Sequence, residues 1–203
     1  MTTSIEQYIS KVMQSFATGQ AREHAHRPAF HDLISGFDPT LTVLNDPARS
    51  EHGNPDFVFL RGDLTAGYAE TKDVGTDLDK TEKSDQLKRY FGYSNLILTD
   101  YLEFRFYRNG ERYGEAIAIG ILSGGVVVPK SENYELLERT IKDFVCSKPE
   151  KIRGGERLAK IMGGKARRIR ENVSRYLLEE SEKSGELRNV YGGVGYNSLD
   201  FST

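Results

Sequence analysis

The sequence predicts an α/β or α+β domain with a mixed β-sheet. Apolar residues follow helical spacing near both ends of the chain, and strand-like segments fill most of the region between residues 41 and 129. The segments run helix, helix, three strands, helix, three strands, helix, an order that favours a sheet flanked by helices. With 203 residues, 37% of them apolar and 10% aromatic, the chain suits one globular core.

The helical segments are identified by apolar residues at helical spacing and by capping residues. Ser4 is a candidate N-cap of the first helix and Ser131 of the fourth. Thr18-Gly19 separates the first two helices. The expected helices cover residues 4–17, 20–35, 78–93, 131–146 and 155–183, the last containing the helix-weakening pair Gly163-Gly164.

In the strand-like segments, apolar and polar residues alternate or the residues are apolar throughout. Two of them, 56–60 and 66–72, are expected to form a hairpin about Gly62-Asp63. Another hairpin is expected within 103–120, turning at Asn109-Gly110, because Asn-Gly suits a two-residue β-turn. The remaining expected strands are 41–45 and 95–100, with a further apolar stretch at 125–129.

Composition excludes several classes of protein. The net charge of −2 and the pI near 6.1 are not those of a polycation. Cys146 is the only cysteine, which excludes an intrachain disulfide framework and a multi-cysteine zinc site. The first residues lack a signal-peptide hydrophobic region, and the most apolar run, 116–129, is too short to span a bilayer. We expect a soluble cytoplasmic protein without a membrane partner.

The first hairpin brings acidic residues together. If it turns at Gly62-Asp63, residues whose numbers sum to about 126 face each other, so Asp56 lies opposite Glu70. Side chains alternate along a strand, so Glu70 and Lys72 share a face while Thr71 points away. Opposed carboxylates are unfavourable unless a cation separates them, and Mg²⁺ accepts such oxygen ligands.

These residues suit phosphodiester hydrolysis. Asp56, Glu70 and the backbone carbonyl of Thr71 are the expected ligands of Mg²⁺, with Mn²⁺ as a substitute. The metal would polarise a phosphate and acidify a bound water, while Lys72 would hold that water in line and offset charge on the phosphate. The alternative interpretation of Glu70 and Lys72 is a solvated strand face.

Pro55-Asp56 followed by Glu70-Thr71-Lys72 resembles the PD-(D/E)XK nuclease superfamily. The resemblance implies a restriction-endonuclease-like α/β core, in which a central mixed β-sheet is flanked by helices, here with a long C-terminal helix. It also implies that Asp56, Glu70 and Lys72 form the catalytic centre.

Two further pairs resemble the RecB-type branch of that superfamily. Gly19 and Glu23 match its G-x-x-x-E motif, and Gln86 and Tyr90 match its Q-x-x-x-Y motif. The resemblance implies that Glu23 reaches the metal site, directly or through water, and that Gln86 and Tyr90 lie beside the phosphate. Considered without the resemblance, Glu23 also suits a surface ion pair with Arg27 at i,i+4. Gln86 also suits an exposed helix position and Tyr90 an ordinary core position.

The same segments, with 156–173, are similar to the N-terminal nuclease region of single-chain restriction-modification enzymes of types IIG and ISP. This likeness implies double-stranded DNA as substrate, methyltransferase and target-recognition domains as partners, and dimerisation for double-strand cleavage. The expected organisation is a nuclease domain over 1–147, a helical linker over 148–185, and a disordered or truncated tail over 186–203.

Two basic segments are candidates for DNA contact. Residues 148–170 contain nine Lys or Arg and two Glu, which suits linker packing first and phosphate contact second. Nearer the expected site, four cations are candidates for contact with the DNA backbone: Lys80, Lys83, Lys88 and Arg89.

Other signals are weaker. Asn54-Pro55-Asp56-Phe57 lacks the second proline of a methyltransferase base-binding loop, and the Gly-rich turn near residue 193 has no βα unit after it. His24 and His26 point to different faces of a helix, which disfavours a shared transition-metal site. Two alternative functions remain beside a restriction nuclease: a non-catalytic DNA-binding or regulatory module, and a DNA-repair nuclease of the same superfamily.

Overall fold

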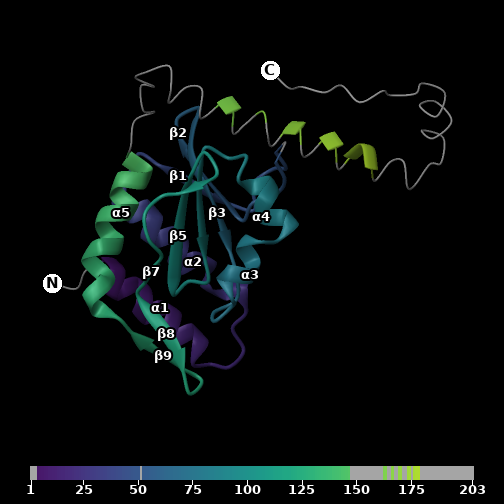
Figure 1. The fold of residues 1–203 in the computed structure, drawn as a ribbon. Coiled ribbons are helices and arrows are strands. Elements are labelled where there is room, and N and C mark those ends of the chain that lie inside the picture. Colours follow the sequence, from purple (N-terminus) through teal and green to yellow (C-terminus); the bar gives the residue numbers. More distant parts are fainter. Residues whose placement is uncertain are drawn as a thin grey trace, which may run out of the picture. The chain divides into compact units, whose positions relative to one another are not determined.

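A computed structural model describes residues 4–50 and 52–146 and, beyond these, residues 162, 163, 166, 169, 170, 173, 174 and 176–178. The chain divides into two compact units, Met1–Glu150 and Lys151–Thr203. The first unit carries the β-sheet (Figure 1). In the second unit the described residues are helical, but most of the expected helix 155–183, the basic segment 148–170 and the tail 186–203 lie outside the described residues.

A mixed sheet forms the centre of the first unit, in the order β1-β2-β3-β4-β5-β6, with β7 also paired to β5. Only β3 and β4 run parallel among its described pairs. Its strands are β1 (Thr42–Asn45), β2 (Phe57–Arg61), β3 (Leu64–Thr71), β4 (Asn95–Thr99), β5 (Glu103–Arg108), β6 (Glu111–Arg112) and β7 (Ile117–Ala118).

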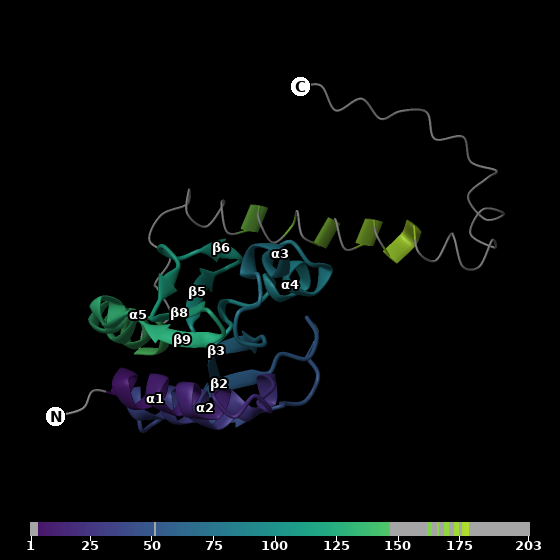
Figure 2. The ribbon, with the colours of Figure 1, turned by 90° about the horizontal axis from the view of Figure 1, so that it is seen from below.

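Helices cover both faces of this sheet (Figure 2). On one face α1 (Ser4–Phe16), α2 (Glu23–Phe37) and α5 (Tyr134–Cys146) enclose the larger apolar core. On the other face the short helices α3 (Leu78–Glu82) and α4 (Asp85–Tyr90) enclose a smaller core. Alternation sorts the strand residues between the two cores: Phe57 and Ala69 face α2, whereas Leu96 and Leu98 face α4.

The single helix expected over 78–93 is wrong, because the segment forms two helices. Asp77 caps α3 by accepting hydrogen bonds from the backbone N–H groups of Asp79 and Lys80, at 3.0 and 3.1 Å. The Ser84 hydroxyl then caps α4 by accepting from Leu87 N at 3.3 Å. Each short helix thus has its own N-terminal capping residue, and Ser84 starts α4 directly after α3 has ended.

Two other helix starts differ from expectation. The helix expected from residue 20 begins at Glu23, and the carboxylate of the distant Asp73 accepts the backbone N–H of Glu23 at 2.6 Å. Ser131 starts a 3₁₀ turn, Ser131–Asn133, rather than capping α5 directly.

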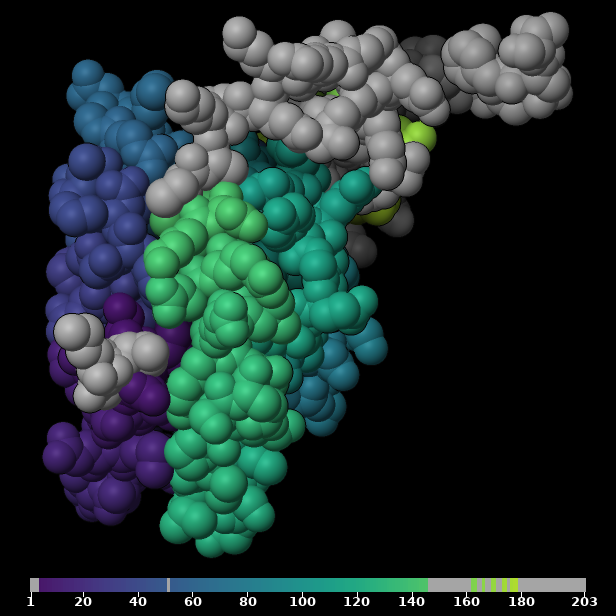
Figure 3. Space-filling view, turned by 90° about the vertical axis from the view of Figure 1, so that its left-hand side faces the viewer, coloured from purple at the N-terminus to yellow at the C-terminus, as the bar shows by residue number. Residues whose placement is uncertain are grey.

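The Asn109-Gly110 turn is confirmed, with φ of 52° and 79° at its two residues. After it, the return strand is broken into β6 and β7, both paired with β5. The apolar stretch near 125–129 contributes β9 (Val126–Pro129), which pairs with β8 (Gly120–Ser123) in a separate two-stranded sheet. This hairpin lies beside α5 on the face shown in Figure 3. No helix among the described residues is long and apolar enough to cross a membrane.

Candidate active site

The β2–β3 hairpin has the expected turn and, near its open end, the expected register. Arg61 pairs with Leu64 across Gly62-Asp63, and Gly62 has a φ of 58°. A bulge between Phe59 and Leu60 shifts the register, after which Phe57 lies opposite Ala69. The residue numbers of that last pair sum to 126, as the predicted register requires. Asp56, which directly precedes β2, therefore lies beside the end of β3.

Asp56 does not point straight across at Glu70. Its Oδ2 accepts the backbone N–H of Thr71 at 2.7 Å and the Thr71 hydroxyl at 2.9 Å. Its Oδ1 accepts a hydrogen bond from Arg27 Nη2. The register agrees with the expected position of Asp56 opposite Glu70, while its carboxylate is held by Thr71 and Arg27.

Glu23 joins this group from the first turn of α2. Arg27 Nη2 also donates to Glu23 Oε1 at 2.8 Å, so one guanidinium bridges two carboxylates. The Thr71 hydroxyl lies 3.4 Å from the same Glu23 oxygen. Glu23 thus pairs with Arg27 at i,i+4, although this pair is largely buried rather than on the surface, and it lies beside the strand end that carries the candidate ligands. Its contact with a metal stays a prediction.

Glu70 and Lys72 share one face of the sheet, the face toward α4. Lys72 Nζ donates to Glu70 Oε1 at 2.6 Å and to Gln86 Oε1 at 3.3 Å. The predicted shared face is thus confirmed, but the alternative of a solvated face is wrong, since Glu70 is only 2% exposed.

Gln86 and Tyr90 connect that lysine to the loop before β2. Gln86 Nε2 donates to the Tyr90 hydroxyl at 3.3 Å, and this hydroxyl donates to the Asn54 carbonyl at 2.6 Å. Tyr90 is buried, as expected for an aromatic residue of the core. The chain of contacts therefore runs from Lys72 through α4 to the residue two before Asp56.

Burial and charge shift the pKa values of three site residues. Burial raises the pKa of Glu70 to about 7, the Asp56 carboxylate adds to the rise, and Lys72 opposes it. Burial alone would lower the pKa of Lys72, but the Glu70 carboxylate outweighs it and raises that pKa. For Arg27, burial is likewise outweighed by Glu23 and Asp56, which raise its pKa. The site thus concentrates negative charge away from water.

Acceptor atoms remain for a cation. Among the described residues, three buried side-chain atoms have no hydrogen-bond partner: His26 Nδ1, Arg27 Nε and Glu70 Oε2. Asp56 accepts three hydrogen bonds, whereas a carboxylate has about four acceptor positions. Glu70 Oε2 and Asp56 Oδ1 therefore have acceptor capacity left for a cation.

Protein groups supply only part of a coordination shell for Mg²⁺ at this site. Within the described residues, no three Asp, Glu, His or Cys side chains are grouped to hold a metal ion by themselves. Mg²⁺ commonly takes one or two carboxylates and completes its shell with water and phosphate oxygens. Asp56, Glu70 and the Thr71 carbonyl match that smaller requirement.

Sequence reasoning missed several residues that build the site. Arg27 was weighed only as a surface partner of Glu23, yet its side chain is 9% exposed and also contacts Asp56 and, at 3.2 Å, Asn45. Tyr101, at a φ of 72°, donates from its hydroxyl to the Glu23 carbonyl at 2.7 Å. The i,i+4 spacing was a signal for Arg27, whereas nothing local identifies Asn45 or Tyr101.

The four candidate DNA-contact cations are exposed, as a backbone contact requires. Lys80 Nζ lies 3.4 Å from Asp77 and Lys88 Nζ 3.0 Å from Asp85, so nearby acids offset part of their charge. Their contact with DNA stays a prediction.

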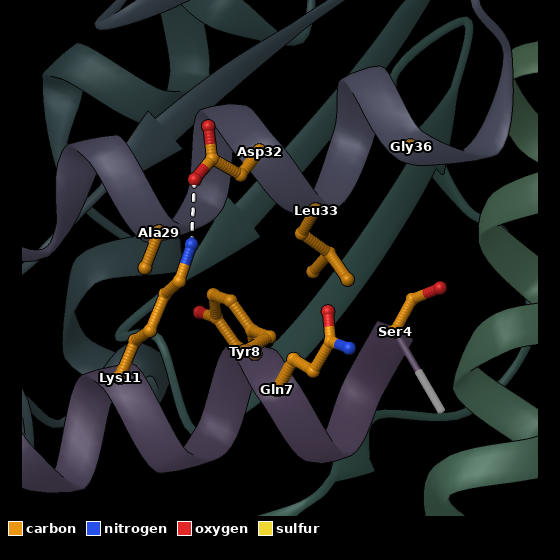
Figure 4. Close-up of a pocket in the computed structure, with 8 residues that line it drawn as sticks. All are labelled: Ser4, Gln7, Tyr8, Lys11, Ala29, Asp32, Leu33 and Gly36. Atoms are coloured by element: carbon orange, nitrogen blue, oxygen red, sulfur yellow. Dashed lines mark hydrogen bonds and ion pairs between the residues drawn. The ribbon is translucent and has the colours of Figure 1, made fainter. Parts of the chain in front are cut away.

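A surface depression lies apart from these residues, between α1 and α2 (Figure 4). Lys11 reaches across it to Asp32 at 2.7 Å, an exposed ion pair. It is lined by none of the candidate catalytic residues: the lining is Ser4, Gln7, Tyr8, Lys11, Ala29, Asp32, Leu33 and Gly36. A nuclease site that admits a DNA backbone need not be a deep cavity, and the convergence of charged groups locates the candidate site better.

Comparison with known proteins bears on the fold. No protein-family model matches the chain, and no curated protein matches it. Among solved structures the chain is similar to one in a cryoEM structure of a DrdV–DNA complex, with a TM-score of 0.54 and 19% sequence identity. The match covers 70% of this chain and 14% of that one. This likeness confirms the predicted fold class, a restriction-endonuclease-like core with a mixed sheet flanked by helices.

Proposed function

We propose that this chain is the nuclease domain of a DNA-cleaving enzyme of the PD-(D/E)XK superfamily. The observation that carries the proposal is the convergence of Asp56, Glu70 and Lys72 at neighbouring strand ends, with a buried Glu70 oxygen that has no hydrogen-bond partner. The likeness to a chain of a DrdV–DNA complex supports DNA as the substrate.

Asp56, Glu70 and the Thr71 carbonyl would hold Mg²⁺ or Mn²⁺, which supplies Lewis-acid activation of the phosphate. Lys72 has a different task. Its ammonium is held by Glu70 and Gln86, so it is oriented before substrate arrives. From there it positions the attacking water and stabilises the charge that develops on the phosphate oxygens.

Glu23, Gln86 and Tyr90 support these groups. Gln86 orients Lys72, and the Tyr90 hydroxyl anchors the loop that leads to Asp56. For Tyr90 the proposed role is therefore anchoring of the loop rather than contact with the phosphate.

The larger assembly follows from the same proposal. The domain would cleave double-stranded DNA as the endonuclease module of a restriction-modification enzyme in the cytoplasm. Methyltransferase and target-recognition domains would supply sequence recognition, and a second copy would cut the second strand. Exposed Lys80, Lys83, Lys88 and Arg89 would contact the DNA backbone through charge.

The proposal is tested with the full chain, supercoiled plasmid and Mg²⁺ or Mn²⁺. We expect nicking without strong sequence preference, and a loss of about 100-fold or more in Lys72→Ala, because a preorganised charge at the phosphate is removed. Lys142→Ala is the control, since the charge of this exposed lysine on α5 contacts Glu138 and the Phe37 ring rather than a candidate catalytic residue. Equal nicking by the wild type and Lys72→Ala would favour a non-catalytic DNA-binding module.

A further inference from the structure

One residue of the site lies outside every motif of the superfamily pattern. Arg27, in the second turn of α2, bridges Glu23 and Asp56 through a single guanidinium nitrogen, Nη2. Its Nη1 donates to Asn45 Oδ1 at 3.2 Å, which ties the side chain to β1. These contacts join three separate segments, and the arginine side chain is only 9% exposed.

The balance of charge explains why a cation is needed there. Three carboxylates, Glu23, Asp56 and Glu70, share the site with two cations. Lys72 pairs with Glu70, and Arg27 pairs with the other two acids. Without Arg27, Glu23 and Asp56 would be largely buried negative charges without a paired cation, and removing one partner of a buried ion pair is strongly destabilising.

The geometry also limits where a second cation binds. Asp56 Oδ2 is fully used by the backbone N–H and hydroxyl of Thr71, and Oδ1 faces Arg27. Glu23 Oε1 is shared by Arg27 and the Thr71 hydroxyl. Glu70, by contrast, has a whole oxygen without a hydrogen-bond partner.

We propose that Arg27 is the internal counter-ion of the site, a positioning residue that keeps Glu23 and Asp56 assembled before a divalent cation binds. Asp56 and Glu70 would then hold the cation, and Glu23 supports them through its contacts with Arg27 and Thr71. This inference rests on the metal site of the proposed function, but it concerns the protein before the metal is bound.

The test compares Arg27→Met with Arg105→Met in the full chain. Arg105 is a matched control, because it is 6% exposed and its guanidinium also pairs with several acids, Asp79, Glu82 and Glu103. Thermal unfolding is measured with a chelator and then along a Mn²⁺ titration. Both variants are expected to lower the Tm without metal by roughly 6 °C or more.

Only the Arg27→Met variant is expected to recover as Mn²⁺ is added, because the divalent cation replaces the missing charge and binding stabilises the folded state. The gap between Arg105→Met and the wild type should stay constant. Arg27→Lys, which keeps the charge but lacks the planar fork, should restore part of the metal-free Tm.

Two results would overturn the inference. One is a metal-free Arg27→Met protein as stable as the wild type. The other is a stability gap that Mn²⁺ leaves unchanged, which would make Arg27 an ordinary structural ion pair. Failure of the proposed function is detected separately, as equal plasmid nicking by the wild type and Lys72→Ala, and it leaves the outcome of the stability test intact.

Discussion

Two buried arginines organise two clusters of acids in this domain, and the clusters differ in what they leave unsatisfied. Arg105, on β5, pairs with Glu103 at 2.6 Å and with Asp79 and Glu82 at 2.8 Å. Glu82 accepts further hydrogen bonds from Tyr107 and Arg112. No atom of this cluster is among the buried atoms without a partner in the described part of the chain.

The cluster around Arg27 is built from similar residues, yet it is incomplete. Arg27 Nε and Glu70 Oε2 are buried without partners, and burial holds the pKa of Glu70 near 7. A cluster that only stabilises the fold satisfies its polar groups, because an unsatisfied buried group is costly. The unsatisfied atoms of the Arg27 cluster therefore indicate a place where a ligand completes the structure.

The largest effect is expected when one carboxylate in each cluster is replaced by its amide and the two variants are compared. Glu70→Gln should reduce plasmid nicking by about 100-fold or more, because the charged ligand of the metal is lost. Its Tm without metal should fall less than that of Glu82→Gln, because burial already disfavours the charge of Glu70 and so offsets part of the loss of its pairing with Lys72. Cleavage assays and thermal unfolding measure the two effects.

Glu82→Gln is the counterpart. It should leave nicking within about twofold, but weaken the charged contacts with Arg105 and Arg112, at a cost of about 1–3 kcal/mol in the free energy of unfolding. If Glu70→Gln were the less stable and equally active protein, the distinction between a functional and a structural cluster would be wrong.

A smaller effect is expected from the loop that carries Asp56. Gly53 has a φ of 127°, and a Cβ atom there would lie 2.7 Å from Cε1 of the Tyr90 ring. Gly53→Ala should therefore displace the loop from α4, lower the stability by about 2 kcal/mol, and reduce nicking as Asp56 shifts.

Gly62→Ala is the control for backbone strain alone, because Gly62 has a φ of 58° but no atom within 4 Å of an added Cβ. It should cost about 1 kcal/mol and leave cleavage unchanged. Urea denaturation and plasmid nicking compare the two variants, and equal losses of activity would argue against the role of Tyr90 as the anchor of the loop.

The smallest effect concerns a third arginine, the more exposed Arg61, which donates to Asp38 at 2.6 Å. Hydrogen bonds from the Thr40 hydroxyl and from Arg61 lower the pKa of Asp38 to about 2. A carboxyl whose pKa is lower in the folded protein stabilises it above the ordinary pKa, near 3.8, and loses this contribution as the pH falls toward 2.

Asp38→Asn should therefore reduce the stability by about 1 kcal/mol or less at pH 6 and by less still below pH 3. Urea midpoints of the wild type and the variant across this range measure the difference. A difference that grows as the pH falls would contradict the sign of the shift.

Much of the hairpin was predictable from local rules. Gly62-Asp63 supplied the turn, and strand alternation placed Glu70 and Lys72 on one face, where the structure has them in contact. The split of 78–93 into two helices was missed, because helical periodicity continues through the segment while the Ser84 side chain caps a second helix start within it.

The wider site was predictable only as a set of residues. Motif spacing brought Glu23, Gln86 and Tyr90 into the prediction, and the structure places all three next to the candidate ligands or their supports. The hydrogen-bond partners of these residues were not predictable, because each contact joins positions far apart in the chain, such as Tyr90 with Asn54 and Tyr101 with Glu23.

The sequence by itself determined the main helices and the turn, register and shared Glu70–Lys72 face of the first hairpin, because these depend on neighbours along the chain. Only the tertiary structure decided that Asp56 turns to Thr71 and Arg27 and that Glu70 is buried with one oxygen unpaired. Burial and pairing depend on which surfaces pack together, and they determine the electrostatics on which the proposed chemistry relies.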